Sequence, residues 1–371
     1  MQMRAAVTRE VGHLAIEEVE LDPPGDGEVL VRICAAGVCH SDLHTMRGEL
    51  RAVPPLVLGH EGAGIVESVG RGVTRCKPGD RVVINWLPAC ESCSTCLAGR
   101  HNLCERLAAT TFQALLSDGT TRLRTKDGLA LKHFLSAATM AEFSVIDESS
   151  AVPIPDDVPF EVAAVVGCAV ATGVGAVMNT ARARPGFPAV VIGCGGVGLS
   201  ALLGCRLAGC NPIVAVDVLD SKLEFATALG ADATLNSAAC ESAPKELRKL
   251  TGGGAEYSFD SVGSAATVGL ALQAVRPGGT ATIVGLHAAK EQIPVPVGAL
   301  VLQNKCLLGS FAGSIRPRLD LPRLLNLYRT GRLPLDGLIS RRYPLDGLEA
   351  AFADMESGEV ARGVLALEPA A

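Results

Sequence analysis

Six short apolar runs recur at a nearly constant spacing in the second half of the chain, and this spacing restricts the fold most strongly. Their starts lie about 20 to 26 residues apart. Strands separated by stretches long enough for a helix predict βαβ units and a doubly wound parallel sheet. Six such strands are enough for a complete dinucleotide-binding domain. The runs are Val190–Ile192, Ile213–Val216, Ala233–Leu235, Tyr257–Phe259, Thr280–Val284 and Cys306–Leu308.

A glycine-rich turn of the form G-x-G-x-x-G follows the first run and opens a helix expected over Val197–Ala208. In such a turn Gly193 permits the sharp bend, Gly195 lets the backbone approach a pyrophosphate, and Gly198 lets helix and strand pack closely. The helix N-terminus also offers free N–H groups to an anion. An ordinary strand-to-helix turn is the alternative.

Asp217 ends the next apolar run, about 20 residues beyond the glycine-rich turn. An acid at this distance accepts hydrogen bonds from the adenosine ribose of a dinucleotide. Its negative charge, with Asp220 nearby, would repel a 2′-phosphate. The pattern therefore favours NAD over NADP.

The first 150 residues show a different pattern, with short β-branched runs bounded by Gly, Pro or Asp. The runs Glu28–Ala35, Gly64–Val69 and Arg81–Asn85 predict strands of a small barrel. Near the C-terminus the pattern predicts helices over Leu319–Arg329 and Leu348–Ser357 and a strand over Gly363–Leu367.

Composition excludes several partners. The net charge is −6, no run of Lys or Arg occurs, and aromatic residues make up only 4%, which argues against nucleic acid binding. Val162–Ala181 carries no charge and is long enough to span a membrane, but its glycines and polar residues predict a buried helix instead. The N-terminal segment lacks the apolar stretch of a secretory signal, so we expect a cytoplasmic protein without a membrane partner.

Four of the thirteen cysteines cluster within 15 residues, at Cys90, Cys93, Cys96 and Cys104. In a reducing compartment, clustered cysteines indicate a metal site before disulfides. Four thiolates at short spacing suit a closed tetrahedral zinc, and a site with no open position is structural. A redox disulfide pair is a minor alternative, and the acidic charge argues against a nucleic-acid zinc finger.

A second possible metal set involves Cys39, His60 and the distant Cys168. A catalytic zinc needs about three protein ligands and one open position, which these residues could supply. From spacing alone, a buried cysteine and a satisfied core histidine are the commoner interpretation.

Several motifs in a fixed order now identify a family. The chain resembles the zinc-dependent medium-chain alcohol dehydrogenases over nearly its full length. The matching motifs are G-H-E-G-A-G at 59–64, the four-cysteine lobe, Gly167-Cys168 followed by Thr172-Gly173, and the glycine-rich turn with Asp217. The resemblance implies an α/β fold with a GroES-like β-barrel catalytic domain plus a doubly wound parallel-sheet Rossmann domain. It implies a catalytic domain over 1–169 with the cysteine lobe at about 88–106, an NAD-binding domain over 170–310, and a return to the catalytic domain over 311–371.

The resemblance also implies roles for individual residues. Cys39, His60 and Cys168 would bind the catalytic zinc, Glu61 would be a nearby and transient ligand, and Asp42 would orient the ring of His60. Ser41 would take the substrate proton, and His44 would pass it to solvent. At the cofactor, the implied contacts are Gly193, Gly195, Gly196, Gly198, His40 and Arg362 at the pyrophosphate, Asp217 and Lys222 at the ribose, and Val197, Val284, Phe311 and Thr172 at the nicotinamide.

Within this family, the stretch Phe112–Phe143 resembles the glutathione-dependent formaldehyde dehydrogenase branch. That branch carries an Arg where this chain has Ala108 and usually a Tyr where it has His44. Of the branch's two acidic contacts to the thiol substrate, Glu49 aligns with one, and Arg51 replaces the other. The family's substrate-pocket positions fall on Trp86, Leu135 and Leu286, which are all apolar and favour alkyl or aryl primary alcohols.

The resemblance thus implies an NAD-dependent enzyme with two zinc ions per subunit, a homodimer or homotetramer, that interconverts a primary alcohol and its aldehyde. A thiol-adduct formaldehyde dehydrogenase is the first alternative. A zinc-free quinone or enoyl reductase of the same fold is the second, and Cys39, His60 and Cys168 argue against it. A non-catalytic zinc- and dinucleotide-binding regulator is the third.

Overall fold

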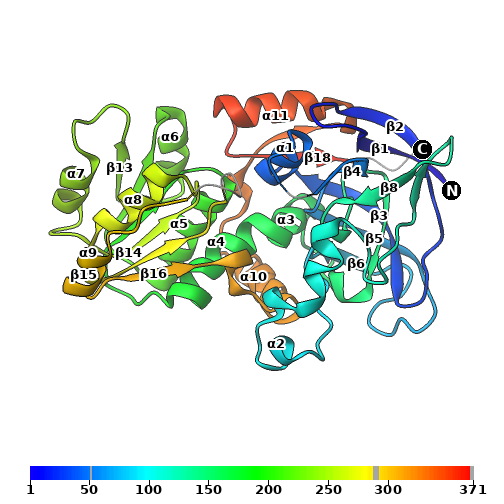
Figure 1. The fold of residues 1–371 in the computed structure, drawn as a ribbon, viewed down its shortest axis with the longest axis horizontal. Coiled ribbons are helices and arrows are strands. Elements are labelled where there is room, and N and C mark those ends of the chain that lie inside the picture. Colours follow the sequence, from blue (N-terminus) through cyan, green and yellow to red (C-terminus); the bar gives the residue numbers. More distant parts are fainter. Residues whose placement is uncertain (51, 287–291, 368–371) are drawn as a thin grey trace.

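A six-stranded, all-parallel sheet forms one end of the molecule (Figure 1). The computed structural model describes residues 1–50, 52–286 and 292–367. The strand order is β13-β12-β11-β14-β15-β16, and every strand overlaps one of the apolar runs, so the predicted doubly wound sheet is confirmed. The strands are β11 (Ala189–Ile192), β12 (Ile213–Asp217), β13 (Ala233–Asn236), β14 (Ala255–Asp260), β15 (Val275–Ile283) and β16 (Cys306–Gly309).

The order of this sheet reverses beside β11, whose neighbours are β12 and β14. In open α/β sheets, ligands bind outside the carboxyl ends of the strands at such a reversal. The glycine-rich turn follows β11 and therefore lies at this point. The helices of this half are α5 (Gly196–Ala208), α6 (Asp220–Ala228), α7 (Ala243–Leu250), α8 (Ala265–Ala274) and α9 (Val297–Leu302).

The other end of the molecule contains a closed barrel of order β1-β2-β7-β8-β4 and a seven-stranded sheet of order β10-β6-β5-β3-β18-β17, with β9 also paired to β3. This confirms the predicted GroES-like barrel. The barrel strands are β1 (Gln2–Thr8), β2 (Ala15–Leu21), β4 (Leu56–Val57), β7 (Leu123–Thr125) and β8 (Ala130–His133). The sheet strands are β3 (Glu28–Gly37), β5 (Gly62–Val69), β6 (Arg81–Ile84), β9 (Phe143–Asp147), β10 (Ala151–Pro153), β17 (Ile339–Tyr343) and β18 (Arg362–Ala366).

The C-terminal segment returns to this second sheet. Strand β18 pairs antiparallel with β3, with Leu365 opposite Ala36, and β17 lies parallel to β18. Two helices of this segment, α10 (Pro317–Arg329) and α11 (Leu348–Ser357), cover the regions predicted as helical. The domain limits at residues 169/170 and 310/311 stay a prediction.

The helices nearer the N-terminus are α1 (His40–Met46) and α2 (Ser94–Leu97).

A long apolar helix over residues 160–181 connects the two halves. It consists of α3 (Phe160–Val165), the π-turn η6 (Val166–Val170), α4 (Ala171–Gly175) and the π-turn η7 (Ala176–Ala181). By length and composition it could cross a membrane, but 83% of its most apolar window is buried, as expected of a core helix. A Cβ on Gly173 would lie 2.4 Å from the Val197 carbonyl oxygen, and one on Gly175 would lie 2.3 Å from that of Gly313. Glycine therefore permits the close approach of this helix to its neighbours.

His133, at the end of β8, should make stability depend on pH. The Arg122 backbone N–H donates to its Nε2 at 3.2 Å, its Nδ1 has no partner in the described structure, and burial lowers its pKa to about 3 from an ordinary 6.5. The unfolded chain therefore binds more protons between these pH values, so His133 makes the protein less stable as pH falls below 6.5. The free energy of unfolding of the unmodified protein should therefore fall between pH 6.5 and pH 5. We expect this fall to be about 2 kcal/mol smaller in the His133→Gln variant.

Urea unfolding of both proteins at the two pH values measures this difference. His13→Gln, at an exposed histidine, is the matched control and should leave the pH dependence unchanged. An equal loss of stability in the His133→Gln variant and the unmodified protein would contradict the expectation.

Candidate active site and metal centres

Three residues far apart in the sequence meet in one buried cluster. Cys39 precedes α1, His60 lies between β4 and β5, and Cys168 occupies the π-turn η6. The ligand atoms of Cys39, Asp42 and His60 lie within 4.8 Å of one another, and so do those of His60, Glu61 and Cys168. The structure therefore brings together the three ligands that the sequence suggests for a catalytic metal.

The chemistry of this cluster suits zinc. Zn–S bonds of about 2.3 Å in a tetrahedron place ligand atoms about 4 Å apart, and two sulfurs with one imidazole leave a position open. Contact with the Cys168 thiol holds the pKa of Cys39 well below its usual value, which favours a thiolate. The Oε2 atom of buried Glu61 has no hydrogen-bond partner among the described residues, as expected beside a cation.

Asp42 fixes the orientation of His60. Its fully buried carboxylate accepts the backbone N–H of Gly59 at 2.9 Å and faces His60 Nδ1 at 3.3 Å. A carboxylate at Nδ1 sets the tautomer and leaves Nε2 free to bind a metal. The structure thus places Asp42 in the orienting position that the resemblance implies.

The two residues of the implied proton relay lie on the same short helix, α1. Ser41 Oγ is 3.7 Å from Cys39 Sγ, at the edge of the cluster. His44 lies one turn further on, and its Nδ1 pairs with the Glu49 carboxylate. Glu49, matched in the sequence to a glutathione contact, is therefore engaged by His44 in this structure. Arg51 lies outside the described residues.

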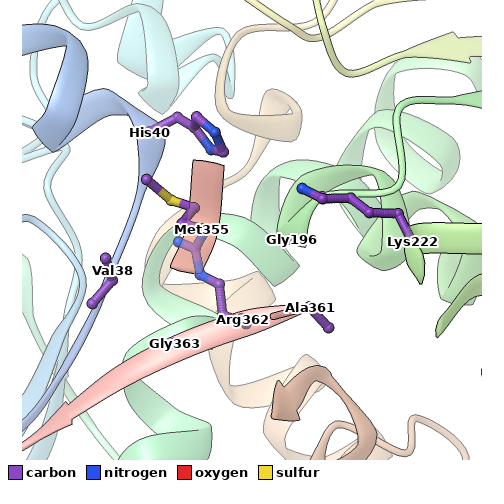
Figure 2. A pocket seen from close by; sticks show the side chains of 9 residues that line it. Val38, His40, Gly196, Lys222, Met355, Ala361, Arg362 and Gly363 are labelled. Atoms are coloured by element: carbon purple, nitrogen blue, oxygen red, sulfur yellow. The ribbon is translucent and has the colours of Figure 1, made fainter. Parts of the chain in front are cut away.

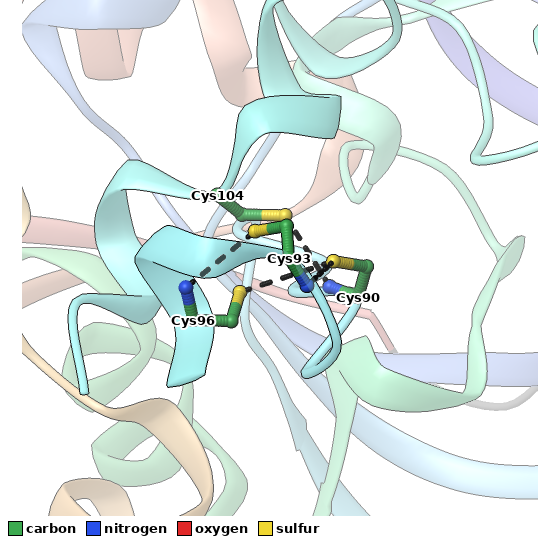
Figure 3. A group of neighbouring side chains, drawn as sticks. All are labelled: Cys90, Cys93, Cys96 and Cys104. Atoms are coloured by element: carbon green, nitrogen blue, oxygen red, sulfur yellow. Dashed lines mark hydrogen bonds between the residues drawn. The ribbon is translucent and has the colours of Figure 1, made fainter. Parts of the chain in front are cut away.

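The four clustered cysteines form a second candidate metal site, around the start of α2 (Figure 3). Their sulfurs lie within 4.8 Å of one another. The backbone N–H groups of Cys93, Cys96 and Cys90 donate to sulfurs of the cluster at 3.3, 3.5 and 3.3 Å. Hydrogen bonds from Ser92, chiefly from its backbone, lower the pKa of Cys90 to about 5. Such N–H···S contacts stabilise thiolates and suit a closed zinc site.

The glycine-rich turn forms one side of a cleft at the carboxyl end of β11. Gly193 has φ +85°, and a Cβ on Gly198 would lie 1.7 Å from the Gly193 carbonyl oxygen. A Cβ on Gly195 would meet no atom within 4 Å, so this glycine faces open space. Asp217 accepts the Cys194 backbone N–H at 2.7 Å, which ties the acid to the turn. Gly193, Gly195 and Gly198 thus have the geometry expected of a turn that binds a pyrophosphate.

Two cationic side chains and one imidazole line the cleft, and they come from both halves of the molecule (Figure 2). Lys222 extends from the parallel-sheet half, and His40 and Arg362 come from the barrel half. Burial lowers the pKa of His40 to about 4, so its ring is neutral. Arg362 is buried and pairs with Glu61, so it connects this cleft to the Cys39 cluster.

A row of aromatic rings runs outward from the buried metal cluster. His60 lies between Phe134 and Trp86, with ring centroids 5.5 and 6.1 Å away. Trp86 meets Phe311 at 5.5 Å, and Phe311 meets Phe112 at 5.9 Å. Phe112 and Phe134 were not assigned a role from the sequence, and no periodic pattern could have found them, because their partners lie far away in the chain.

The remaining predicted pocket and cofactor positions differ in their exposure. Leu135 follows Phe134 and is half-buried, whereas Leu286 is 67% exposed and lines neither described cleft. Val197 is the second residue of α5 and lies within the glycine-rich turn, Thr172 lies in α4, and Val284 follows β15; all three are half-buried.

Comparison with known proteins gives matches over almost the whole chain. Residues 25–156 match the alcohol dehydrogenase GroES-like domain, and residues 196–330 match the zinc-binding dehydrogenase domain. The S-(hydroxymethyl)glutathione dehydrogenase of Paracoccus denitrificans is 38% identical over 98% of this chain and all of its own length. The putative alcohol dehydrogenase D of Mycobacterium tuberculosis is 40% identical over the same shares. The crystal structure of benzyl alcohol dehydrogenase from Acinetobacter calcoaceticus superposes with a TM-score of 0.93 at 31% identity, covering 99% of this chain and all of that one.

Proposed function

The chain belongs to the zinc-dependent medium-chain alcohol dehydrogenase family, and from that premise we propose that it interconverts primary alkyl or aryl alcohols and their aldehydes with NAD. Zinc-dependent alcohol dehydrogenase activity follows from the family itself. The observation that carries the finer proposal is the row of apolar rings that begins at His60. Such a wall suits a hydrocarbon substituent on the reacting carbon better than a polyol.

The residues around the cluster divide the chemistry among them. Cys39, His60 and Cys168 would hold a zinc ion, which would supply a Lewis acid for the substrate hydroxyl. The glycine-rich turn would hold NAD, which would supply the hydride acceptor. Ser41 takes the hydroxyl proton, and His44 passes it to solvent, with its ring held from the outer side by Glu49. The buried ring of Trp86, packed against Phe311, would form the apolar wall beside the reacting carbon.

The choice of NAD over NADP rests on Asp217. One of its oxygens accepts the N–H of Cys194, and the other accepts the N–H groups of Val218 and Leu219. These bonds fix the orientation of the carboxylate that the family resemblance assigns to the adenosine ribose. A 2′-phosphate there would meet a fixed negative charge.

The thiol-adduct alternative is supported by the Paracoccus relative, which acts on S-(hydroxymethyl)glutathione by name. Against it, Ala108 lines an outer cleft, between the cysteine lobe and Phe311, where that branch carries an Arg, and the Glu49 carboxylate pairs with His44. Formaldehyde oxidation that requires added glutathione would establish the alternative.

Zinc content and NADH formation together test the proposal. We expect two zinc ions per chain and NADH formation with benzyl alcohol or medium-chain primary alcohols. The assay should be repeated with an added aldehyde as acceptor, so that turnover is detected even if NADH stays bound to the enzyme. Zinc well below two per chain, or no turnover in either assay, would refute the proposal.

A second copy of the chain is our proposed partner at the sheet edge. Strand β16 ends the six-stranded sheet, and none of the six residues of neighbouring α9 is buried. Leu302 is 88% exposed, and Val297 and Val301 are also exposed. An edge strand beside exposed apolar side chains is a typical self-association surface. This supports a homodimer, which could pair again into a homotetramer.

Substituting Leu302 with glutamate should weaken this association. A charge placed in an apolar interface costs free energy on burial, so the dimer should dissociate at concentrations where the unmodified protein stays dimeric. Light scattering during gel filtration measures the mass. Leu97→Glu, at an exposed leucine in α2, is the matched control and should leave the mass unchanged.

The cytoplasm stays our expectation for the location, because a reducing compartment keeps cysteines as free thiols that can bind metal.

A further inference from the structure

A second carboxylate–imidazole pair lies at the end of α1, one turn and more beyond the pair that orients His60. Asp42, inside the helix, faces Nδ1 of His60, and both side chains are buried. Glu49, just after the helix, pairs with Nδ1 of His44, and these side chains are 45% and 29% exposed. A carboxylate at one ring nitrogen determines which nitrogen carries the proton. The same helix can therefore fix the state of two imidazoles.

The way in which α1 ends places Glu49 against His44. The Glu49 N–H donates to the His44 carbonyl oxygen at 2.8 Å, and the Gly48 N–H donates to that of Thr45 at 3.0 Å. Gly48 has φ +75°, in the left-handed region. These features define a Schellman motif, in which the side chains of the two residues joined by the outer bond approach each other. Those residues are His44 and Glu49, so the backbone itself brings the two side chains together.

The neighbouring charged groups leave the Glu49 carboxylate to His44. Arg47, two residues before Glu49, donates to both carboxylate oxygens of Glu356 in α11, at 2.6 and 2.9 Å. The ring of His40 lies 6.0 Å from that of His44. Burial lowers the pKa of His40 to about 4, so its ring carries no charge at neutral pH. Arg47 is thus held away by its own partner, and His40 adds no competing charge.

The pairing at Nδ1 has a consequence for the other nitrogen of His44. A neutral imidazole carries one proton, so a proton donated from Nδ1 to Glu49 leaves a lone pair on Nε2. A general base needs such a lone pair. Ser41 and His44 are three residues apart on α1 and therefore lie on the same face of the helix. Once Nε2 has taken up a proton, the carboxylate of Glu49 stabilises the imidazolium.

We infer that Glu49 is a positioning residue of the proton relay, which holds His44 in the tautomer that accepts a proton at Nε2. The inference rests on the proposed function and deepens it. In alcohol oxidation an O–H bond of the substrate breaks, Ser41 takes up the proton, and an N–H bond forms at Nε2 of His44. The proton on Nδ1 stays hydrogen-bonded to Glu49, and the imidazolium then releases one proton to water. Glu49 would therefore keep the base ready for each turnover.

The tautomer of His44 is the direct test, and its measurement needs neither NAD nor an alcohol. Nitrogen-15 NMR of the zinc-loaded enzyme with labelled histidine distinguishes protonated from unprotonated ring nitrogens at about pH 9, above the ordinary range of imidazole titration. A His44→Gln sample identifies the His44 signals by their loss. We expect the proton on Nδ1 in the unmodified enzyme and a mixture of both tautomers in Glu49→Met, whose side chain has a similar length but no carboxylate. The same tautomer in both proteins would overturn the inference.

The rate of NADH formation in the first turnover tests the role in the relay. Because a general base contributes about 10²–10⁴-fold and water can replace part of a half-exposed partner, we expect Glu49→Met to lower this rate about tenfold. The KM for the alcohol and the affinity for NAD should not change, whereas a misfolded site would alter both. Glu49→Asp retains a carboxylate and should recover most of the rate. An aspartate variant as slow as Glu49→Met would contradict a role for the carboxylate.

Glu10→Met is the matched control. Glu10 is exposed and lies in the loop whose Gly12 N–H donates to the Met46 carbonyl oxygen at 2.8 Å, so the variant removes the same charge beside α1. It should leave the His44 tautomer and the first-turnover rate unchanged, and an effect equal to that of Glu49→Met would overturn the inference. If Glu49→Met changes the tautomer but the unmodified enzyme oxidises no alcohol, the proposed function fails and the positioning of His44 stands. If alcohols are oxidised but Glu49→Met keeps the tautomer and the rate, the inference fails and the proposed function stands.

Discussion

Replacing Cys168 with alanine is expected to lower kcat/KM for alcohol oxidation about 10³-fold or more and to remove one of the two zinc ions. Lewis-acid stabilisation of developing charge is worth several kcal/mol, and each 1.36 kcal/mol is a factor of ten in rate. With Cys39 and His60 alone, the cluster offers too few ligands to hold zinc tightly. His60→Ala would be a poorer test, because it would leave the buried Asp42 carboxylate without its partner.

The matched control is Cys76→Ala. Cys76 and Cys168 are both 8% exposed, so both substitutions remove a buried sulfur and leave a similar cavity. Cys76→Ala should retain two zinc ions and kcat/KM within about twofold. Elemental analysis, circular dichroism and steady-state kinetics are the measurements. A Cys168→Ala protein with two zinc ions and full activity would show that the cluster is not the catalytic centre.

Replacing Gly198 with alanine is expected to abolish NAD binding and to lower the free energy of unfolding by about 3 kcal/mol. The new Cβ would lie 1.7 Å from the Gly193 carbonyl oxygen, a distance at which the backbone must move. Overpacking of this kind costs about 1–3 kcal/mol or more. Because Gly193 forms the bend of the cradle, its displacement also moves the N–H groups that face the pyrophosphate.

Calorimetric titration with NAD and urea unfolding measure the two effects. Gly269→Ala is the control, since its Cβ would meet only one side-chain atom, Gln273 Nε2, at 3.9 Å. Alanine is also the better helix former, so α8 should become slightly more stable and NAD affinity should not change. Retention of NAD affinity by Gly198→Ala would contradict the assignment of the turn.

The parallel sheet was predictable because its central strands β11, β12 and β14 are buried on both faces and so appear as continuous apolar runs. Strand β4 was not, because two residues, Leu56 and Val57, are too short for any pattern. The cysteine lobe was found because its four ligands are close in sequence. The cluster of Cys39, His60 and Cys168 could be suggested only weakly from spacing, and the family resemblance pointed to it.

Contacts between distant segments were the part that sequence reasoning missed. The hydrogen bond from Asn102 to Phe311 joins residues 209 positions apart, and nothing in either neighbourhood marks the pair. The π-turn at Cys168 was also missed, because a run of Val, Ala and Gly has the same pattern in an α-helix and a π-helix. In both cases tertiary packing decides the local geometry.

The cysteine lobe has one further consequence, for how this enzyme could change over evolution. Four cysteines hold the lobe's backbone together, so the exposed side chains of Leu103 and Ala108 beside them contribute little to folding. These same side chains form the outer cleft, away from Cys39, His60 and Cys168. Mutations at these positions would leave the cluster of Cys39, His60 and Cys168 unchanged, so the proposed reaction centre and the surface of the cysteine lobe can change independently during evolution.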